Sequence, residues 1–174
     1  MSTVIIKKLV SLQEVQVCDS LFREYMHWLI QELYAAHAII ITPDQEERLH
    51  TDFREEWPSL IGERGGIYLA TLDEIPLGVC TLKPISETEV ELKRFYVKPG
   101  NRGRGIGRQL IELVLTETIN MGYQIVRLET FAFMETALKM YKLHGFEQVN
   151  AFEGYEGASH GTGGVELFMI KRNY

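Results

Sequence analysis

The sequence predicts one domain of the α/β or α+β class, built on a mixed sheet. Its 174 residues are 45% hydrophobic and 24% charged, which is the balance of a soluble globular chain of single-domain size. Short runs of strand character alternate with apolar stripes at helical spacing. In the second half of the chain, predicted strands stand on both sides of each predicted helix, and this alternation favours a sheet covered by helices.

The chain should begin with a strand over residues 4–10, followed by a long helix. Ser11 and Glu14 have the spacing of a capping box, in which a hydroxyl and a carboxylate satisfy the free N–H groups of a helix start. From residue 12 to 33 apolar side chains recur at steps of three and four, which places them on one face of a helix.

A second helix is expected from Thr42, because Thr42 and Gln45 form another capping box with Pro43 at the first helical position. This segment is more acidic and less apolar than the first. Trp57 precedes Pro58, and the residue before a proline disfavours helical backbone. We therefore expect the second helix to end near this pair.

Three strands should follow, over residues 66–71, 77–82 and 88–97, where apolar and β-branched residues stand between turn residues. An apolar stripe over residues 106–119, stopped by Gly122, predicts the next helix. The rest of the chain predicts a strand at 123–130, a short helix at 135–144, strands at 146–152 and 165–171, and a glycine-rich loop at 154–164 before the last strand.

The net charge of −6 is unevenly distributed. Residues 1–90 carry 7 Lys and Arg against 15 Asp and Glu, whereas residues 91–174 carry 11 against 9. Between Leu92 and Ile111 there are six basic residues and no acidic one. A local basic patch on an acidic chain favours a small anionic ligand over a nucleic acid, which requires a broader basic surface.

Composition also limits compartment and partners. No apolar run approaches the ~20 residues that cross a membrane, and the first residues lack the pattern of a signal peptide, so we expect a cytoplasmic protein without a membrane partner. The spacing of Cys18 and Cys80, the only cysteines, indicates neither a metal site nor a disulfide framework. We expect two reduced, buried thiols and no metal. The oligomeric state is open, and a homodimer is compatible with the sequence.

The stretch GNRGRGIGRQL at residues 100–110 follows a predicted strand and opens a predicted helix. The first turn of a helix carries free N–H groups and a partial positive charge, so it can hold a phosphate. Glycines let the backbone approach such an anion closely, and arginines add charged donors at its rim. We therefore expect a pyrophosphate site on the following residues: Arg102, Gly103, Arg104, Gly105, Ile106, Gly107 and Arg108.

The spacing of the glycines separates this stretch from two other phosphate-binding motifs. A dinucleotide fold has G-x-G-x-x-G near its first strand, whereas these glycines read G-x-G-x-G late in the chain. A P-loop requires Gly-Lys followed by Ser or Thr, and that sequence is absent. A glycine-rich turn without a ligand is the remaining alternative.

Two segments resemble signatures of the GNAT superfamily of N-acetyltransferases. VKPGNRGRGIG at residues 97–107 resembles the acetyl-CoA-binding signature Arg/Gln-x-x-Gly-x-Gly/Ala, and the preceding ELKRFYV resembles the strand that comes before it. ALKMYKLHGF at residues 137–146 resembles the second signature, a helix ending Tyr-x-x-x-Gly-Phe. The order of predicted elements also matches from Val4 to Lys171, so the resemblance covers nearly the whole chain.

This resemblance implies a GNAT-like fold over residues 1–174, with a mixed, mostly antiparallel sheet of about six to seven strands flanked by about four helices. It implies acetyl-CoA as co-substrate and transfer of the acetyl group to a primary amine of a small molecule or peptide, by direct attack in a ternary complex. The pantetheine arm should lie along Phe95, Tyr96 and Val97, where a main-chain N–H polarises the thioester carbonyl. Met134 stands where many members have an asparagine that contacts the cofactor.

Two residues are candidates for the proton transfers of this reaction. Glu91 lies six residues before Val97, where the histone-acetylating branch of the family has its general base; Glu89 or a water chain is the second choice. Tyr141 matches the family tyrosine that protonates the leaving thiolate. The alternatives are that Glu91 only pairs with Lys93 or another base, and that Tyr141 is a core aromatic residue.

A second function remains open, because a non-catalytic acyl-CoA-binding sensor would keep the loop but require neither Glu91 nor Tyr141. A nucleic-acid-binding module is disfavoured by the overall acidity. The acceptor site should be shaped by the long first helix, the 154–164 loop with His160, and the acidic second helix. A solvated helix face explains that acidity equally well, on these residues: Glu46, Glu47, Asp52, Glu55 and Glu56.

Overall fold

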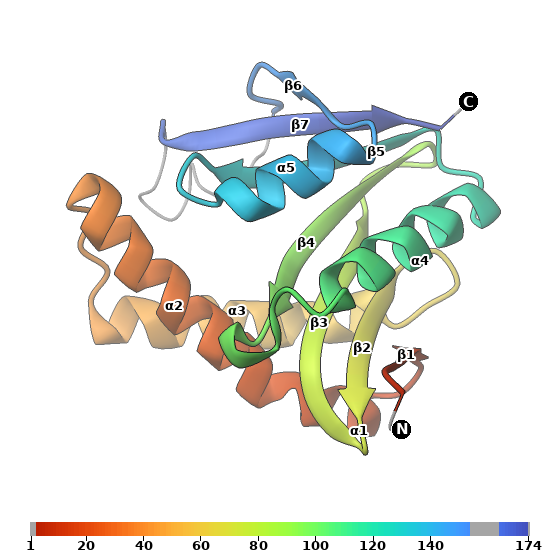
Figure 1. Cartoon of the computed structure of the whole chain (residues 1–174), viewed down its shortest axis with the longest axis horizontal. Helices are drawn as coiled ribbons and strands as arrows, with labels where there is room; N and C mark the ends of the chain where they lie inside the picture. The colour runs from red at the N-terminus through yellow and green to blue at the C-terminus, as the bar shows by residue number, and fades with distance from the viewer. Residues whose placement is uncertain (1–2, 154–163, 174) are drawn as a thin grey trace.

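A single mixed sheet of seven strands organises the fold, in the order β1-β2-β3-β4-β5-β7-β6 (Figure 1). The computed structural model describes residues 3–153 and 164–173. The strands are β1 (Ile5–Leu9), β2 (Gly66–Leu72), β3 (Ile75–Pro84), β4 (Glu89–Val97), β5 (Ile125–Phe131), β6 (Glu147–Val149) and β7 (Glu166–Arg172). Only β4 and β5 run parallel, so the predicted mixed, mostly antiparallel sheet is confirmed.

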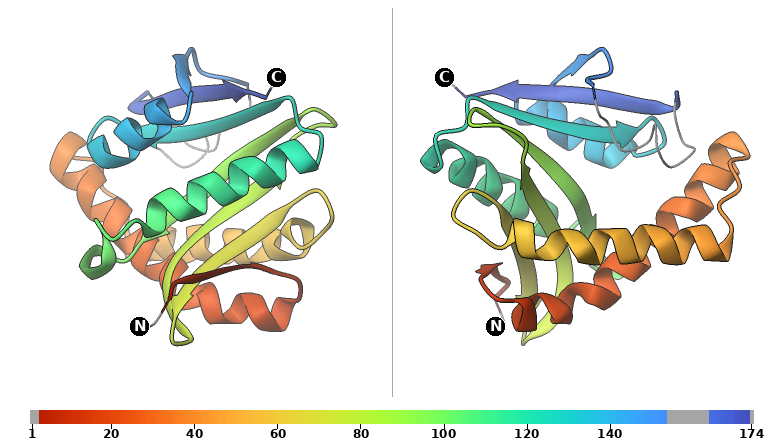
Figure 2. Two further views of the ribbon diagram at one scale, coloured as in Figure 1. Left: turned by 45° about the vertical axis from the view of Figure 1, so that its right-hand side comes forward. Right: turned by 180° about the vertical axis from the view of Figure 1, so that it is seen from behind.

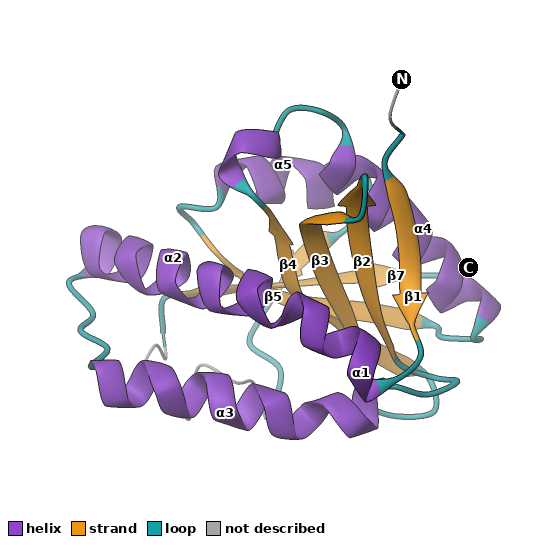
Figure 3. Ribbon diagram, turned by 90° about the horizontal axis from the view of Figure 1, so that it is seen from below, coloured by secondary structure: helices purple, strands orange, loops and turns teal. Residues whose placement is uncertain are grey.

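Helices cover both faces of this sheet (Figure 2). The helices are α1 (Leu12–Val15), α2 (Asp19–His37), α3 (Pro43–Leu60), α4 (Ile106–Asn120) and α5 (Glu135–Leu143). One core lies between the sheet and α4 with α5, and a second lies between the opposite face and α1 to α3. Figure 3 shows α2 and α3 running side by side across that opposite face. Among residues 3–153 and 164–173, no helix combines the length and apolar character needed to cross a bilayer.

A bulge in β4 opens the sheet on one side. Val79 pairs with Tyr96 and Thr81 with Lys93, so Arg94 and Phe95 together stand opposite a single residue of β3. Arg94 has a φ of 53°, in the left-handed region. Such a bulge bends and twists its strand. Pairing between β4 and β5 accordingly ends at Glu91, and the two strands then diverge (Figure 1).

The predicted helix over residues 12–33 is interrupted. After α1 the chain winds as a 3₁₀ turn, Gln16–Cys18, and α2 then continues to His37. Residues three apart lie on one line in a 3₁₀ helix. This winding buries Val15, Cys18 and Leu21 completely, each at 0% exposure, which explains why the tighter turn is favoured here.

The expected end of the second helix near Trp57 and Pro58 is wrong, because α3 continues to Leu60 and contains Pro58 in its last turn. The proline lacks one N–H, so a single helical bond is lost close to the helix end. Trp57 and Leu60 are both buried, and the Ile61 N–H donates to the Trp57 carbonyl at 3.1 Å. Burial of these two side chains outweighs that one bond.

The remaining elements lie close to their expected positions. Both cysteines are unpaired and buried, as predicted. Only residues 147–149 of the expected strand at 146–152 pair in the sheet. Most of the glycine-rich loop, residues 154–163 with His160, lies outside the described residues.

Candidate active site

The glycine-rich stretch forms the loop that opens α4. Gly103 and Gly105 have φ angles of 75° and 80°, a region that residues with a Cβ rarely adopt. Gly105 caps α4, and no side chain of the described residues caps this N-terminus. The first N–H groups of α4 therefore remain available to a ligand, and they favour an anion.

A cavity of about 570 Å³ lies against this loop, between the end of β4, the first turn of α4, and α5. It brings together the predicted cofactor-binding residues Phe95, Tyr96, Val97, Arg102, Gly103, Gly105, Ile106, Gly107 and Arg108. Arg104 is not among its lining residues, and the Arg104 guanidinium donates to Asn101 Oδ1 at 3.1 Å.

Gly107 exposes bare backbone to this cavity. A Cβ built at Gly107 would lie 3.7 Å from the Phe95 ring and 3.8 Å from both Met140 Sδ and Val97 Cγ2, which are ordinary contact distances. The packing of the protein therefore does not require glycine at this position. Close approach of a ligand to the backbone does explain it.

Arg102 connects the end of β4 to α2. Its Nε donates to the Val97 carbonyl at 3.0 Å, and its guanidinium carbon lies 5.1 Å from the Trp28 ring centroid and 5.7 Å from that of Tyr96. Arg108 likewise has a protein partner, Glu112, at 2.7 Å. Trp28 also lines this cavity of about 570 Å³, and no motif in the sequence indicated it.

Tyr141 lies on α5 and lines the same cavity. Its ring contacts Phe95 edge-on at a centroid distance of 6.2 Å and Phe146 at 5.6 Å. Burial raises the pKa of the Tyr141 phenol far above its ordinary value, so the hydroxyl keeps its proton at neutral pH. The two signature segments, distant in the sequence, thus meet at one cavity.

Met134 also lines this cavity, just before α5. The Met134 N–H donates to the Phe131 carbonyl at 3.0 Å, and the Met134 carbonyl accepts from Leu138 at 2.9 Å. Both backbone groups are therefore engaged within the protein, and the Met134 sulfur also accepts from Thr130 Oγ1 at 3.4 Å.

A second cavity, of about 100 Å³, lies beside the α2–α3 pair. Its walls are mainly apolar, and they include Tyr25, Met26, Leu29, Ile30 and Leu33 of α2, together with Ile41, Leu49 and Phe131. Its charged lining residues are Glu91, Lys93, Arg94, Glu129 and Glu166.

Glu91 stands at the last position where β4 pairs with β5, opposite Arg127. Its side chain is buried at 4% exposure, and its Oε2 accepts from Arg127 Nε at 3.0 Å. Arg127 Nη2 lies 3.0 Å from the same oxygen, and Lys93 Nζ lies 3.9 Å from Oε1. The ion pair that the sequence left open as an alternative is therefore formed. Glu89 lines neither of these two cavities.

Sequence reasoning missed Glu129 and Glu166, which line the smaller cavity from β5 and β7. Alternation along β5 places Glu129 on the same face as Arg127, and Glu166 pairs opposite Phe131. A single glutamate in a strand carries no local signal of a site, so only the pairing of distant strands brings these two side chains to Glu91.

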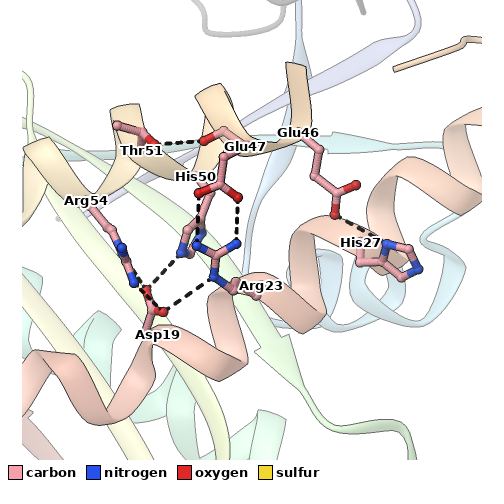
Figure 4. A network of polar contacts seen from close by, with 8 residues as sticks. All are labelled: Asp19, Arg23, His27, Glu46, Glu47, His50, Thr51 and Arg54. Carbon is pink, nitrogen blue, oxygen red and sulfur yellow. Dashed lines mark hydrogen bonds and ion pairs between the residues drawn. The ribbon is translucent and has the colours of Figure 1, made fainter. Parts of the chain in front are cut away.

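None of the five acidic residues of α3 named above lines either cavity. Glu47 instead forms an ion pair with Arg23 at 2.8 Å, and Glu46 Oε1 lies within hydrogen-bond distance of His27 Nδ1, at 3.3 Å (Figure 4). The interpretation as a charged helix face thus fits this helix better than an acidic wall of the acceptor site.

Beside these pairs, Asp19 of α2 joins α3 by accepting from His50 Nε2 at 2.8 Å and Arg54 Nη2 at 2.6 Å (Figure 4). Burial lowers the pKa of His50, and the nearby Asp19 carboxylate only partly offsets this. Burial would raise the pKa of Asp19, but the bonds from Arg54 and His50 hold it below its ordinary value.

Comparison with known proteins gives one family. The model of the "Acetyltransferase (GNAT) family" matches residues 23–146. The chain is 33% identical over 73 residues to the uncharacterized N-acetyltransferase YjgM of Escherichia coli, covering 41% of this chain and 44% of that protein. It is 35% identical over 81 residues to an IAA acetyltransferase of Azospirillum brasilense, covering 47% of this chain and 50% of that protein. The chain spans about half the length of the curated relatives it matches.

The fold is also shared with solved structures. The PaiA N-acetyltransferase of Thermoplasma acidophilum, solved in complex with coenzyme A, superposes with a TM-score of 0.72 over 98% of this chain and 99% of that one, at 21% identity. At that identity the likeness concerns the fold. Residues 23–146 are well over half of the 174 residues, and this match shows that the chain belongs to the GNAT acetyltransferase family.

Proposed function

We propose that this acetyltransferase transfers the acetyl group of acetyl-CoA to a primary amine of a small molecule or peptide by direct attack, with both substrates bound. The observation that carries the proposal is the path of β4. Residues 91–94 line the smaller cavity and residues 95–97 line the larger one, at the place where pairing with β5 has stopped. The edge of β4 thus runs from the larger cavity, at the helix start that favours an anion, to the smaller cavity, which contains carboxylates.

The larger cavity fits the requirements of acetyl-CoA. The N–H groups of the loop and of the first turn of α4, residues 102–108, would hold the pyrophosphate. The edge of β4 after Glu91 has no ladder partner on β5, so the pantetheine arm can bind there as an added strand, along Phe95, Tyr96 and Val97. A main-chain N–H of this segment would polarise the thioester carbonyl.

The reaction requires two proton movements. An alkylamine has a pKa of about 10 and reaches the site protonated. We assign Glu91 as the group that accepts the amine proton, directly or through water. Its Oε1 would take the proton, because Arg127 lies 3.0 Å from Oε2, whereas Lys93 Nζ lies farther from Oε1, at 3.9 Å. The amine nitrogen then bonds to the acetyl carbon and the carbon–sulfur bond breaks. The Tyr141 hydroxyl gives its proton to the departing thiolate, and the second proton that the nitrogen loses on forming the amide passes to Tyr141, directly or through water, and restores its hydroxyl.

Paired variants test these two roles. Glu91→Gln and Tyr141→Phe should each lower kcat by roughly 100-fold or more, because general acid–base groups contribute about that much, while the Kd for CoA changes little. Thiol release measures turnover and calorimetry measures binding. Glu89→Gln is the matched control and should retain activity. Binding of CoA without acetyl transfer to any amine would favour the sensor function instead.

A further inference from the structure

Glu166 is a buried carboxylate, and only one of its two oxygens has a hydrogen-bond partner among the described residues. Its side chain is 8% exposed, and its Oε2 accepts from the Gly164 and Val165 N–H groups at 2.9 Å and 3.2 Å. Its Oε1 is buried and has no hydrogen-bond partner in the part of the chain that the structure describes. A buried acceptor without a donor is costly, so the missing donor requires an explanation.

The residues that line the smaller cavity indicate what kind of group could donate to Glu166 Oε1. Glu166 lines this cavity together with Lys93 and Arg94. Arg127 holds Glu91 Oε2, Lys93 Nζ lies 3.9 Å from Glu91 Oε1, and the Arg94 guanidinium lies 4.3 Å from the Phe53 ring centroid. Glu129 stands on the same face, as a diagonal neighbour of Glu166 across β5 and β7. Because Glu166 lines the cavity and its buried Oε1 lacks a donor among the described residues, a cation with N–H donors that reaches this oxygen would satisfy it.

The walls and size of the cavity restrict the rest of the ligand. Apolar side chains of α2 form one side, so a second charge placed against them would be desolvated without a partner. The volume of about 100 Å³ suits a body of a few carbon atoms, since an apolar cavity of roughly 150 Å³ holds benzene. Three of the five charged residues that line the cavity are acidic, so an ammonium group is favoured there over a carboxylate.

We propose that Glu166 binds the ammonium group of the acceptor, and that the acceptor is a small apolar primary amine without a carboxylate. This deepens the proposed function and depends on it for the identity of the reaction. Glu166 is a specificity-determining residue here, whereas Glu91 remains the proposed proton acceptor.

A pair of ligands that differ only in a carboxylate tests the substrate class. 3-Methylbutylamine and leucine share one side chain, and each is titrated calorimetrically at pH 7.5 into the full chain saturated with CoA. We expect 3-methylbutylamine to bind at least tenfold more tightly than leucine, and more tightly than spermidine. Equal binding of leucine, tighter binding of spermidine, or no binding of 3-methylbutylamine would overturn the proposal.

The variant Glu166→Gln keeps the shape of the side chain and removes its charge. We expect its Kd for 3-methylbutylamine to rise at least tenfold, with the Kd for CoA and the Tm near those of the parent, because charge-assisted bonds are worth about that much. Glu147→Gln, at an exposed position of the neighbouring β6, is the control and should bind like the parent. Parent-like amine binding by Glu166→Gln would overturn the role of Glu166.

Turnover separates this inference from the proposed function. If Glu166 only binds the acceptor, Glu166→Gln raises KM for the amine at least tenfold and leaves kcat within about twofold. A large fall in kcat at unchanged KM would contradict the binding role. Amine binding that depends on Glu166, without acetyl transfer by the parent, would contradict the proposed function and support this inference.

Discussion

Gly107 is a residue at which stability and ligand binding favour different side chains. In the first turn of α4 an alanine has ordinary contact distances, and alanine favours a helix over glycine by about 0.5–1 kcal/mol. Gly107→Ala should therefore raise the free energy of unfolding slightly, as measured by urea titration. Because its methyl group enters the larger cavity, the Kd for CoA measured by calorimetry should rise at least tenfold.

The control for this substitution is Gly62→Ala, since a Cβ at Gly62 meets no atom within 4 Å and Gly62 lines neither cavity. It should leave CoA binding unchanged. Unaltered CoA binding by Gly107→Ala would show that the ligand does not approach the backbone at this position.

Arg102 differs from Arg104 and Arg108 because its side chain contacts both α2 and the end of β4. Its contacts with Trp28 and the Val97 carbonyl tie α2 to β4, so Arg102→Ala should lower the free energy of unfolding by about 1 kcal/mol. Urea unfolding checks this value, with Arg104→Ala as the control, which should stay within about 0.5 kcal/mol of the parent. Equal stability of the two variants would mean that Arg102 supplies charge alone.

At the scale of elements, the ion-pair network between α2 and α3 makes stability depend on pH. His50 has a pKa below its ordinary 6.5 in the folded chain, so the unfolded chain binds a proton more readily. The free energy of unfolding should therefore fall as pH decreases below about 6.5, until the folded pKa is reached. The lowered pKa of Asp19 removes further stability below about 3.8.

Urea unfolding between pH 8 and pH 5 measures the contribution of His50. His50→Gln should reduce the loss of stability over this interval, whereas His27→Gln, at an exposed position of α2, should keep it. If the pH dependence of His50→Gln equals that of the parent, the titration of His50 does not cause it.

Sequence patterns predicted those elements whose formation depends on residues close together in the sequence. The Thr42–Gln45 capping box forms, and the strand, glycine loop and helix around α4 stand in the expected order. The β4 bulge could not be predicted, because the left-handed residue is Arg94 and not a glycine. The 3₁₀ turn before α2 and the retention of Pro58 in α3 depend on burial against the sheet, which local rules do not contain.

The candidate site likewise combines residues that a local motif predicts with residues that no local pattern predicts. The loop residues carry a motif, and all but Arg104 line one cavity. Glu129, Glu166 and Trp28 carry none, because their proximity to the site arises from pairing of β5 with β7 and from packing of α2. A site assembled from single residues on distant strands is visible only once those strands are placed.

In the molecule as a whole, two cavities lie along β4, where it diverges from β5. The larger cavity lies beside α4 and α5, and the smaller one beside α2 and α3. Two substrates can thus approach one strand edge from opposite sides, which suits direct transfer without an acetylated intermediate on the protein.

This arrangement predicts the kinetic mechanism. Cys18 and Cys80 are fully buried, and burial raises the pKa of Cys18 to about 12, so neither thiol is suited to carry an acetyl group. Initial rates at varied acetyl-CoA and amine should give intersecting lines in double-reciprocal plots. Mass spectrometry after incubation with acetyl-CoA alone should find no acetylated protein. Parallel lines together with an acetylated residue would contradict direct attack.

We propose that acetyl-CoA binds at the N-terminus of α4 and along the end of β4. Backbone amide NMR spectra recorded with and without CoA test this most directly, because they report on the N–H groups themselves. We expect the largest shifts at Ile106, Gly107 and Arg108, with further shifts at Phe95 and Val97. Binding of CoA that leaves these amides unchanged, or no binding at millimolar CoA, would contradict it.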